Sequence, residues 1–414
     1  METDFKFKRR AVSVEEATSL VLSEIRETVA IPLGIGQAAF YRLAEDFAAP
    51  GEYPPFNRSG MDGYAVRSAD TLGASSEAPI LLEVVDHIMC GSKPSVPLGK
   101  GQASRIMTGA MAPPEADAVV MLEQTIEEEA GGKRYIRLKR EAAPGMNLTK
   151  AGDEIRPNER LLTKGTLLQE GELALLATFG AANVRVRRKP KVAILPTGDE
   201  LLPVEAPLAE GKIRNSNGVM LAAQVLKAGG VPELLEPAGD DASKLGERLS
   251  RAFERCDAVI TTGGVSVGDR DVLTDWFAGW DGKLLFNKVM MRPGSPTSAG
   301  SKDGKLLFAL SGNPGACFVG FLLFVRPALL RMQGVERAKP EETEAFLSRD
   351  FTKTNAYERF LRGRLTARSG RLFAEPVGAD QSSVMRTISE ANCLIRIPPT
   401  AGIAADTLVK VIPL

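Results

Sequence analysis

The hydrophobic pattern of the N-terminal half changes twice along the chain. The tetrapeptide SVEE has the spacing of a capping box and predicts a helix over residues 13–26, and a second helix is predicted over 37–47. Short β-type runs punctuated by Gly and Pro extend from 57 to 147, which predicts a β-rich domain. Helical spacing returns over 167–179, so the β-rich segment is expected to be inserted into a unit formed by the flanking helices.

From Lys189 onward, apolar strands, glycine-rich turns and amphipathic helices alternate, which is typical of a parallel sheet flanked by helices. The strands are predicted in KVAILPTG, VPELLEPAG, DAVITTGG and KLLFALSG. The helices are predicted over 218–228, 242–254 and 315–330. After Pro340 the runs are again short and β-like, which predicts a small β domain at the C-terminus.

These patterns together predict a multidomain α/β plus β fold. It has a parallel-sheet α/β domain with helices on both faces, an inserted β-rich domain and a C-terminal small β-barrel-like domain. A length of 414 residues is sufficient for several such cores. The predicted domains are a helical linking domain (1–50 with 150–185), the inserted β-rich domain (51–149), the α/β domain (186–332) and the C-terminal β domain (333–414).

Charge and hydropathy narrow the range of partners. Lys plus Arg and Asp plus Glu are equal at 52 each, so no overall field attracts nucleic acid or an anionic membrane, and neither partner is expected. The longest apolar stretch, Ala316 to Val325, is too short to span a bilayer and fits a buried helix. The basic N-terminal segment is not followed by an apolar stretch, so no secretory signal is predicted and a cytoplasmic location is expected.

The cysteines and the single histidine argue against a soft metal centre. The cysteines at 90, 256, 317 and 393 form no Cys-x-x-Cys pair, which argues against zinc or iron–sulfur ligation. His87 lies in a strand-like run and is interpreted as a surface or partly packed residue. Any metal chemistry is therefore expected to use oxygen ligands.

Three loops follow predicted strands of the α/β domain at the same edge of its sheet. TGDEL places Glu200 at the carboxyl end of a strand, where open α/β sheets bind ligands. TTGGVSVGDRD is a glycine-rich loop that can wrap a phosphate with backbone N–H groups. LSGNPG precedes a predicted helix whose N-terminus can bind an anion. Each loop is also compatible with an ordinary tight connection, but three at one edge favour a shared ligand site.

Acidic residues beside phosphate-type loops indicate a hard cation, because carboxylates would otherwise repel an anionic ligand. Glu200, Asp240 and Asp271 are the candidate ligands for Mg²⁺. Lys288 and Arg292 are four positions apart on one predicted strand, so their side chains would share a face roughly 13 Å apart and could hold an oxyanion. The alternative is that both are solvated surface charges.

Three upstream loops carry further polar residues. They are SGMDGYA with Ser59 and Asp62, RIMTGA with Thr108, and AGDEI with Asp153. Taken singly, each has the composition of an ordinary surface loop.

The motifs SGMDGYA, RIMTGA, AGDEI, TGDEL, GGVSVGDRD, RPGSP and SGNPG, in this order, resemble the MoeA family of molybdopterin molybdenumtransferases, which includes the E domain of gephyrin. The likeness spans residues 13–400. It implies a homodimer of elongated subunits, with an active site between the α/β domain of one subunit and the β-rich domain of the other. It also implies that residues 186–332 bind molybdopterin and that molybdate and adenylated molybdopterin are substrates. Mg²⁺ would be the cofactor and AMP a product.

The resemblance, with the loop chemistry, assigns candidate roles. The catalytic candidates are Asp62, Thr108, Asp153 and Asp271, and the metal candidates are Glu200, Asp240 and Asp271. The candidates for substrate binding are Ser59, Gly263, Gly264, Ser266, Lys288, Arg292, Ser311, Gly312, Asn313, Pro314, Arg362 and Ser383. Transient contact with the molybdopterin adenylyltransferase and with cofactor-accepting proteins is also expected.

Three positions depart from the family pattern. The family often has lysine where Arg292 and Ser295 stand, and aspartate where Asn215 stands. Arginine keeps the charge and adds a bidentate fork, whereas Ser295 removes a cation. Two other functions stay open: adenylylation of molybdopterin, because related α/β domains carry similar loops, and a pterin-binding scaffold without enzymatic activity.

Overall fold

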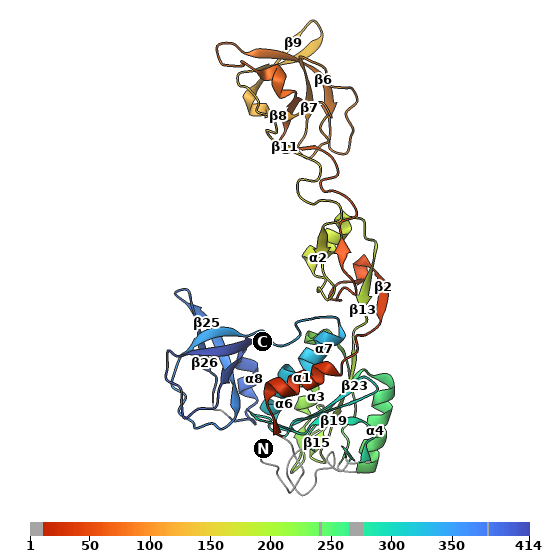
Figure 1. Cartoon of the computed structure of the whole chain (residues 1–414), viewed down its shortest axis with the longest axis vertical. Helices are drawn as coiled ribbons and strands as arrows, with labels where there is room; N and C mark the ends of the chain where they lie inside the picture. Colours follow the sequence, from red (N-terminus) through yellow and green to blue (C-terminus); the bar gives the residue numbers. More distant parts are fainter. Residues whose placement is uncertain (1–10, 240–241, 265–275, 278, 379–380) are drawn as a thin grey trace. The chain divides into compact units, whose positions relative to one another are not determined.

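The computed structural model describes residues 11–239, 242–264, 276–277, 279–378 and 381–414. The chain divides into two compact units, drawn in Figure 1. Unit 1 comprises Met1–Glu45, Lys164–Ala174 and Ala181–Leu414, and unit 2 comprises Asp46–Thr163 and Leu175–Gly180. The chain therefore leaves unit 1 twice to contribute to unit 2 and returns to unit 1 each time.

The predicted N-terminal helix is present as α1 (Val14–Ser23). The Ser13 side chain accepts a hydrogen bond from the Glu16 backbone N–H at 3.0 Å, which confirms the predicted N-cap. The buried face of α1, which includes Ala17 and Val21, packs into the core of the α/β domain. The helix ends at Ser23, three residues before the predicted end.

The second predicted helix, over 37–47, is wrong. Only η1 (Ile35–Gln37) is helical, and the chain then turns through Phe40, whose φ is +60°. The backbone N–H of Phe40 donates to Leu168 O and that of Leu43 to Thr166 O. These pairings with a distant segment replace the hydrogen bonds that a local helix would make, so tertiary contacts override helix propensity. Helical spacing over 167–179 is confirmed by α2 (Glu170–Thr178).

Unit 2 is built around a six-stranded sheet with the strand order β8-β5-β7-β6-β10-β9. These strands are β5 (Gly63–Val66), β6 (Ile80–Ile88), β7 (Gln102–Ile106), β8 (Ala118–Met121), β9 (Thr125–Ala130) and β10 (Lys133–Leu138). Successive residues of β5 pack on opposite faces: Tyr64 and Val66 join one hydrophobic cluster and Ala65 joins the other. The β-rich character expected for this segment is confirmed.

Two short strand pairs in unit 2 bring distant loops together. Strand β3 (Phe47–Ala48) pairs with β12 (Arg160–Leu162), and β4 (Arg58–Ser59) pairs with β11 (Leu148–Thr149). The second pair holds the segment after Asn147 beside the loop that carries Ser59.

The α/β domain of unit 1 has a six-stranded sheet with the order β17-β14-β18-β23-β22-β19. The four predicted strands are the parallel ones: β14 (Lys191–Pro196), β17 (Val231–Leu234), β18 (Ala258–Thr262) and β23 (Lys305–Leu310). Two antiparallel strands extend the sheet, β22 (Ser298–Lys302) and β19 (Lys283–Phe286). The sheet is thus mixed rather than wholly parallel.

Helices cover both faces of this sheet, as expected. Along β14, Val192 and Ile194 join the cluster that contains residues of α1, α3 (Ser216–Lys227) and α6 (Pro314–Gly320), whereas Ala193 and Leu195 join the cluster that contains residues of α4 (Ala242–Arg255). Figure 1 shows α4 on the opposite side of the sheet from α1 and α3.

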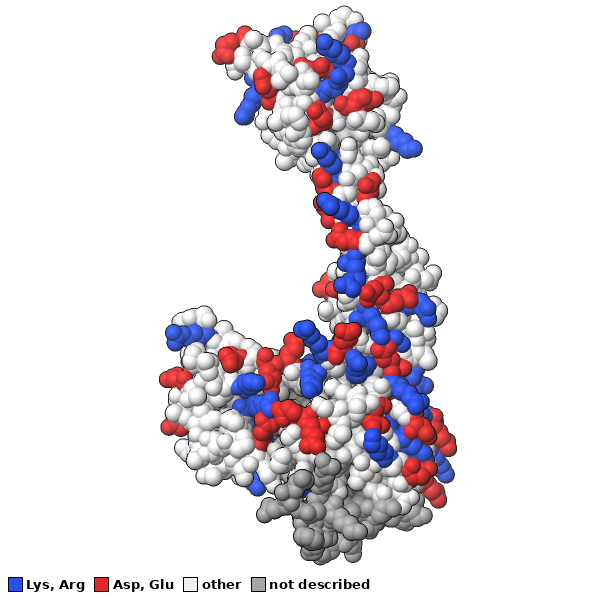
Figure 2. Space-filling model, in the orientation of Figure 1, with Lys and Arg blue, Asp and Glu red and all other residues white. Residues whose placement is uncertain are grey.

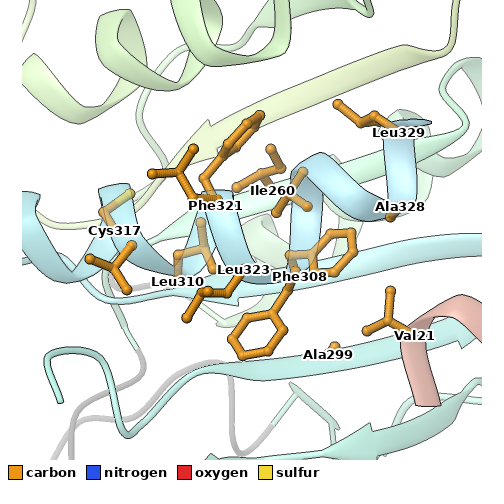
Figure 3. Close-up of a cluster of buried hydrophobic side chains, with 14 of the residues drawn as sticks. Val21, Ile260, Ala299, Phe308, Leu310, Cys317, Phe321, Leu323, Ala328 and Leu329 are labelled. Carbon is orange, nitrogen blue, oxygen red and sulfur yellow. The ribbon is translucent and has the colours of Figure 1, made fainter. Parts of the chain in front are cut away.

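The longest helix of unit 1 runs from Pro314 through the π-helical turn η4 (Phe321–Val325) to α7 (Arg326–Met332). It is long and apolar enough to cross a membrane by length and composition, but 83% of its most apolar window is buried inside the protein. Figure 3 shows its side chains, including Phe321 and Leu323, against Phe308 and Leu310 of β23. The stretch 316–325 is a core helix, as predicted.

The C-terminal segment forms a closed five-stranded barrel. Its strands are β24 (Thr343–Leu347), β25 (Glu358–Arg368), β26 (Arg371–Pro376), β27 (Cys393–Ile397) and β28 (Leu408–Pro413). The barrel closes because β27 pairs with both β28 and β25. Strand β21 (Met291–Arg292) joins the barrel by pairing in parallel with β25.

Candidate functional site

The parallel strands of unit 1 create a topological switch point. After β14 the chain passes to β17 on one side and then crosses to β18 on the other side of β14. Ligands of open α/β sheets bind outside the carboxyl ends of the strands at such a point. Here the backbone N–H of Thr197 donates to Thr262 O at 3.0 Å, and that of Gly263 donates to Leu310 O at 3.1 Å. The three loops predicted to share a ligand site therefore meet at one edge.

Glycine is required where these loops touch. Gly263 has φ +100°, and a Cβ there would lie 2.4 Å from the carbonyl oxygen of Thr197. A Cβ on Gly312 would lie 3.4 Å from the Cα of Gly263. The backbone can approach a ligand closely at both positions because no side chain intervenes.

Asn217 joins the ends of two of the strands. Its Nδ2 donates to Thr262 Oγ1 at 2.9 Å and to Gly312 O at 2.8 Å, and the Thr262 hydroxyl donates to Ser311 O at 3.2 Å. Because a carbonyl oxygen can only accept, the amide nitrogen must face Gly312. Sequence reasoning missed Asn217. The signal was a second asparagine two residues after Asn215, at the second position of α3.

Asn215, where the family often has aspartate, is the N-cap of a helix. The Asn215 side chain accepts a hydrogen bond from Gly218 N at 2.9 Å and N-caps α3. Aspartate and asparagine are about equally good N-caps, so this difference preserves the local structure.

The loops border a cleft of about 1120 Å³ within unit 1. Besides Asn217, its lining includes the predicted site residues Glu200, Gly263, Gly264, Arg292, Ser311, Gly312, Asn313, Pro314 and Ser383. Two further arginines line it, Arg214 and Arg359, which sequence reasoning did not select. The structure thus brings most of the predicted unit 1 residues together.

Arg362 is buried behind the cleft-lining segment that contains Gln381 and Ser383. It is only 5% exposed, its Nε donates to Thr387 Oγ1 at 2.6 Å, and its Nη2 donates to Gln381 O at 2.7 Å. In the residue after Gln381, the backbone carbonyl of Ser382 accepts a hydrogen bond from Gly315 N at 2.8 Å. Arg362 therefore holds the loop that carries Ser383 against the start of α6.

Lys288 and Arg292 do not lie on one strand as predicted. Lys288 is in β20 (Lys288–Val289), which pairs with β1 (Ala11–Val12), whereas Arg292 is in β21 and pairs with β25. Two different neighbours interrupt the strand at Met290, so the prediction of one continuous strand is wrong. Arg292 lines the cleft, whereas Lys288 is not among its lining residues. Ser295 is turned to the backbone, because its hydroxyl donates to Val289 O at 2.8 Å.

Of the three predicted magnesium ligands, Glu200 is the one that lies in the described part of the chain. It folds back beside Gly198, where a Cβ would lie 2.3 Å from Glu200 Oε2. Asp240, Asp271 and the predicted phosphate-binding residue Ser266 lie outside the described residues. In the described ranges, no three His, Cys, Asp or Glu side chains are grouped so that they could hold a metal ion.

A second cluster, in unit 2, contains Asp62 and Thr108. Asp62 Oδ1 accepts hydrogen bonds from Thr108 Oγ1 and Thr108 N, both at 2.7 Å. The bond from the Thr108 hydroxyl, and to a smaller extent the bond from the Thr108 backbone N–H, lower the pKa of the Asp62 carboxyl below its ordinary value. The Thr108 carbonyl in turn accepts from Cys90 Sγ at 2.9 Å. An ionised carboxylate held in this way can orient water or accept a proton.

Ser59 and Asp153 lie in the same unit and stabilise its loops. Ser59 is 2% exposed, its Oγ donates to Met61 O at 2.5 Å, and its backbone carbonyl accepts from Gly109 N at 2.7 Å. Asp153 Oδ2 accepts from Lys150 N at 2.9 Å and so closes its own turn. Their predicted roles in binding and catalysis stay predictions.

Three family descriptions match the chain in order. They are the MoeA N-terminal region (domain I and II) over residues 12–180, the probable molybdopterin binding domain over 193–331, and the MoeA C-terminal region (domain IV) over 344–414.

Whole-length relatives agree with these matches. A molybdopterin molybdenumtransferase of Bacillus subtilis is 44% identical over 98% of this chain and 94% of its own, and one of Staphylococcus epidermidis is 41% identical over 98% and 96%. The solved structure of the molybdopterin biosynthesis MoeA protein of Pyrococcus horikoshii covers 98% of this chain and 100% of its own, with 30% identity and a TM-score of 0.83.

Proposed function

This chain belongs to the MoeA family of molybdopterin molybdenumtransferases, and we propose that it inserts molybdenum from molybdate into adenylated molybdopterin, with Mg²⁺-dependent release of AMP. The observation that carries the proposal is the cleft at the switch point of unit 1. Its glycine loops, Asn217 and arginines suit an anionic, nucleotide-linked substrate. Its size, about 1120 Å³, is sufficient for a ligand larger than a mononucleotide.

The residues of the cleft would divide the work between binding and charge stabilisation. The backbone of the Gly263 and Gly312 loops would hold the phosphates, because these loops admit close approach. Arg292 would hold the oxyanion as a bidentate donor. Asn217 would keep the two glycine loops at a fixed spacing through its bonds to Thr262 and Gly312. The molybdenum itself would be captured by the dithiolene sulfurs of the substrate.

Magnesium fits the described donor set. Mg²⁺ is commonly held by one or two carboxylates together with substrate phosphates, and the Glu200 carboxylate lies in the cleft beside the phosphate-type loops. When bound, the cation would neutralise charge on the pyrophosphate link that breaks. Asp240 and Asp271 stay candidates from the sequence.

The test uses the purified full chain with adenylated molybdopterin, molybdate and Mg²⁺. AMP is measured by chromatography, and finished cofactor by reconstitution of a cofactor-free molybdoenzyme. We expect AMP release to require both molybdate and Mg²⁺. A parallel titration with tungstate decides which oxyanion is preferred. AMP release independent of molybdate, with no finished cofactor, would contradict the proposal.

One further reaction and one binding measurement address the alternatives. Incubation with molybdopterin and ATP would yield adenylated molybdopterin if the chain were an adenylyltransferase, and we expect no such product. A scaffold that has lost its pterin site would bind neither pterin nor nucleotide. The cytoplasmic location, and the transient contacts with the adenylyltransferase and with cofactor-accepting proteins, stay predictions.

We also expect a homodimer. Support comes from apolar side chains on α3 and on the edge strand β17: Leu226 is 62% exposed, and Val219, Val231 and Leu234 are also exposed. Among the described residues, β17 has no strand partner on its outer side, and exposed apolar residues beside such an edge favour association. Light scattering at micromolar concentration should give the mass of two chains, and Leu226→Glu should shift the protein toward one. Leu72→Glu, at an exposed leucine of unit 2, should leave the dimer intact; a wild-type monomer would contradict the prediction.

A further inference from the structure

Two arginines lie side by side at the rim of the cleft. In the parallel pairing of β21 with β25, Arg292 is in register with Arg359. Neighbouring strands are about 4.8 Å apart, and residues in register direct their side chains to the same face of the sheet. Both residues line the cleft. The two side chains therefore leave adjacent strands on the same face and line the same cleft.

Arg359 is held by buried neighbours. Its Nε donates to Asn355 Oδ1 at 3.0 Å, and its guanidinium lies over the Phe351 ring at 5.9 Å from the centroid. Asn355 is only 4% exposed, and its Nδ2 donates to Pro398 O at 3.3 Å. These contacts restrict the side chain, so less conformational entropy is lost when it binds a ligand.

The charge at this rim favours an anion. Among the described lining residues the ionic side chains are three arginines and one carboxylate, Glu200. Two cations on adjacent strands repel each other. An oxyanion bound between them is attracted to both, and these attractions offset the repulsion. The Ser295 side chain is neutral, and its hydroxyl donates to Val289 O. Arg359 supplies the second positive charge from another strand.

We propose that Arg292 and Arg359 form a two-arginine clamp for a tetrahedral oxyanion, which makes Arg359 an additional substrate-binding residue. The clamp deepens the proposed function and rests on it for the identity of the ligand. The oxyanion is either free molybdate or the phosphate of the bound nucleotide, since both present oxygen atoms that match the guanidinium fork.

The test is calorimetric titration of the full chain with molybdate and, separately, with AMP. Arg359→Gln should raise the dissociation constant of one of these anions about tenfold, because a hydrogen bond to a charged group is lost. Arg359→Lys keeps the charge without the fork and should fall between Arg359→Gln and the wild type. Arg364→Gln is the matched control, because Arg364 is exposed on the same strand and is not part of the cleft lining.

The binding results for molybdate and AMP identify the anion that the clamp holds. Weaker binding of molybdate alone assigns the clamp to the free oxyanion, and weaker binding of AMP alone assigns it to the nucleotide phosphate. Unchanged binding of both anions in Arg359→Gln and in Arg359→Lys overturns the clamp, as does a wild type that binds neither. If the glutamine variant does not fold, the lysine variant decides. A wild type that binds an oxyanion through Arg359 but forms no cofactor contradicts the proposed function and leaves the clamp standing.

Discussion

Gly263→Ala is expected to lower the free energy of unfolding of unit 1 by about 3 kcal/mol and the rate of AMP release about a hundredfold. The added Cβ would lie 2.4 Å from Thr197 O and 2.8 Å from Thr197 Oγ1, at a backbone φ of +100°. To relieve this clash, the ends of β14 and β18 must separate at the switch point, because Thr197 N is hydrogen-bonded to Thr262 O. The loops that border the cleft would move with them.

Gly211→Ala is the matched control for this substitution. Gly211 also has a positive φ, +70°, but no atom lies within 4 Å of its would-be Cβ. It should therefore cost only the backbone strain of about 1 kcal/mol and leave the rate of AMP release unchanged. Thermal unfolding and AMP release are measured on both variants. Equal effects of the two substitutions would show that the contact with Thr197 does not matter.

Asp62→Asn is expected to lower AMP release about a hundredfold while unit 2 stays folded. The two donors on Thr108 select an ionised acceptor, and asparagine has no charge with which to orient water or accept a proton. Thr108→Val removes the hydroxyl donor, so the pKa of Asp62 should rise toward its ordinary value. The carboxylate is then protonated at a higher pH, and the acid limb of the pH–rate profile should move upward.

Asp117 offers a matched control within the same unit. Its Oδ1 accepts from Ser68 N and its Oδ2 from Ser68 Oγ, both at 2.6 Å, so, like Asp62, it binds the backbone N–H and the hydroxyl of one residue. Asp117→Asn should lower the stability of unit 2 without changing the rate per folded molecule. If Asp62→Asn and Asp117→Asn reduce the rate equally, Asp62 has a structural role and its catalytic assignment fails.

Much of the α/β domain was predictable because its signals are local. The four parallel strands are short apolar runs that end in Gly or Thr-Gly, and each lies where its sequence placed it. The carboxyl ends of parallel strands share one edge, so the convergence of Glu200, Gly263 and Ser311 on one cleft followed from the order of elements. The equal numbers of acidic and basic residues also agree with the interleaved charges on the face shown in Figure 2.

The missed features depend on contacts between distant segments. The chain around Phe40 bonds to Thr166 and Leu168 instead of forming a helix. The strand expected through Lys288 and Arg292 is split because β1 and β25 pair with its two halves. Periodicity within a window cannot reveal such partners.

Two of the cleft residues that were not predicted, Asn217 and Arg359, were missed for a related reason. Asn217 matters because it joins the ends of β18 and β23, and Arg359 matters because it lies in register with Arg292. Neither role is visible before the topology is known. An amide in a helix and an arginine in a strand are otherwise ordinary surface chemistry.

Hydrogen exchange of the full chain, with and without adenylated molybdopterin, tests whether the cleft of unit 1 binds this substrate. We expect slower exchange at the backbone of 262–264, 311–315 and 381–383 when the substrate is present, because these segments border the cleft of unit 1. Protection confined to the barrel groove lined by Glu358, Arg396 and Lys410, with no change at the three loops, would contradict it.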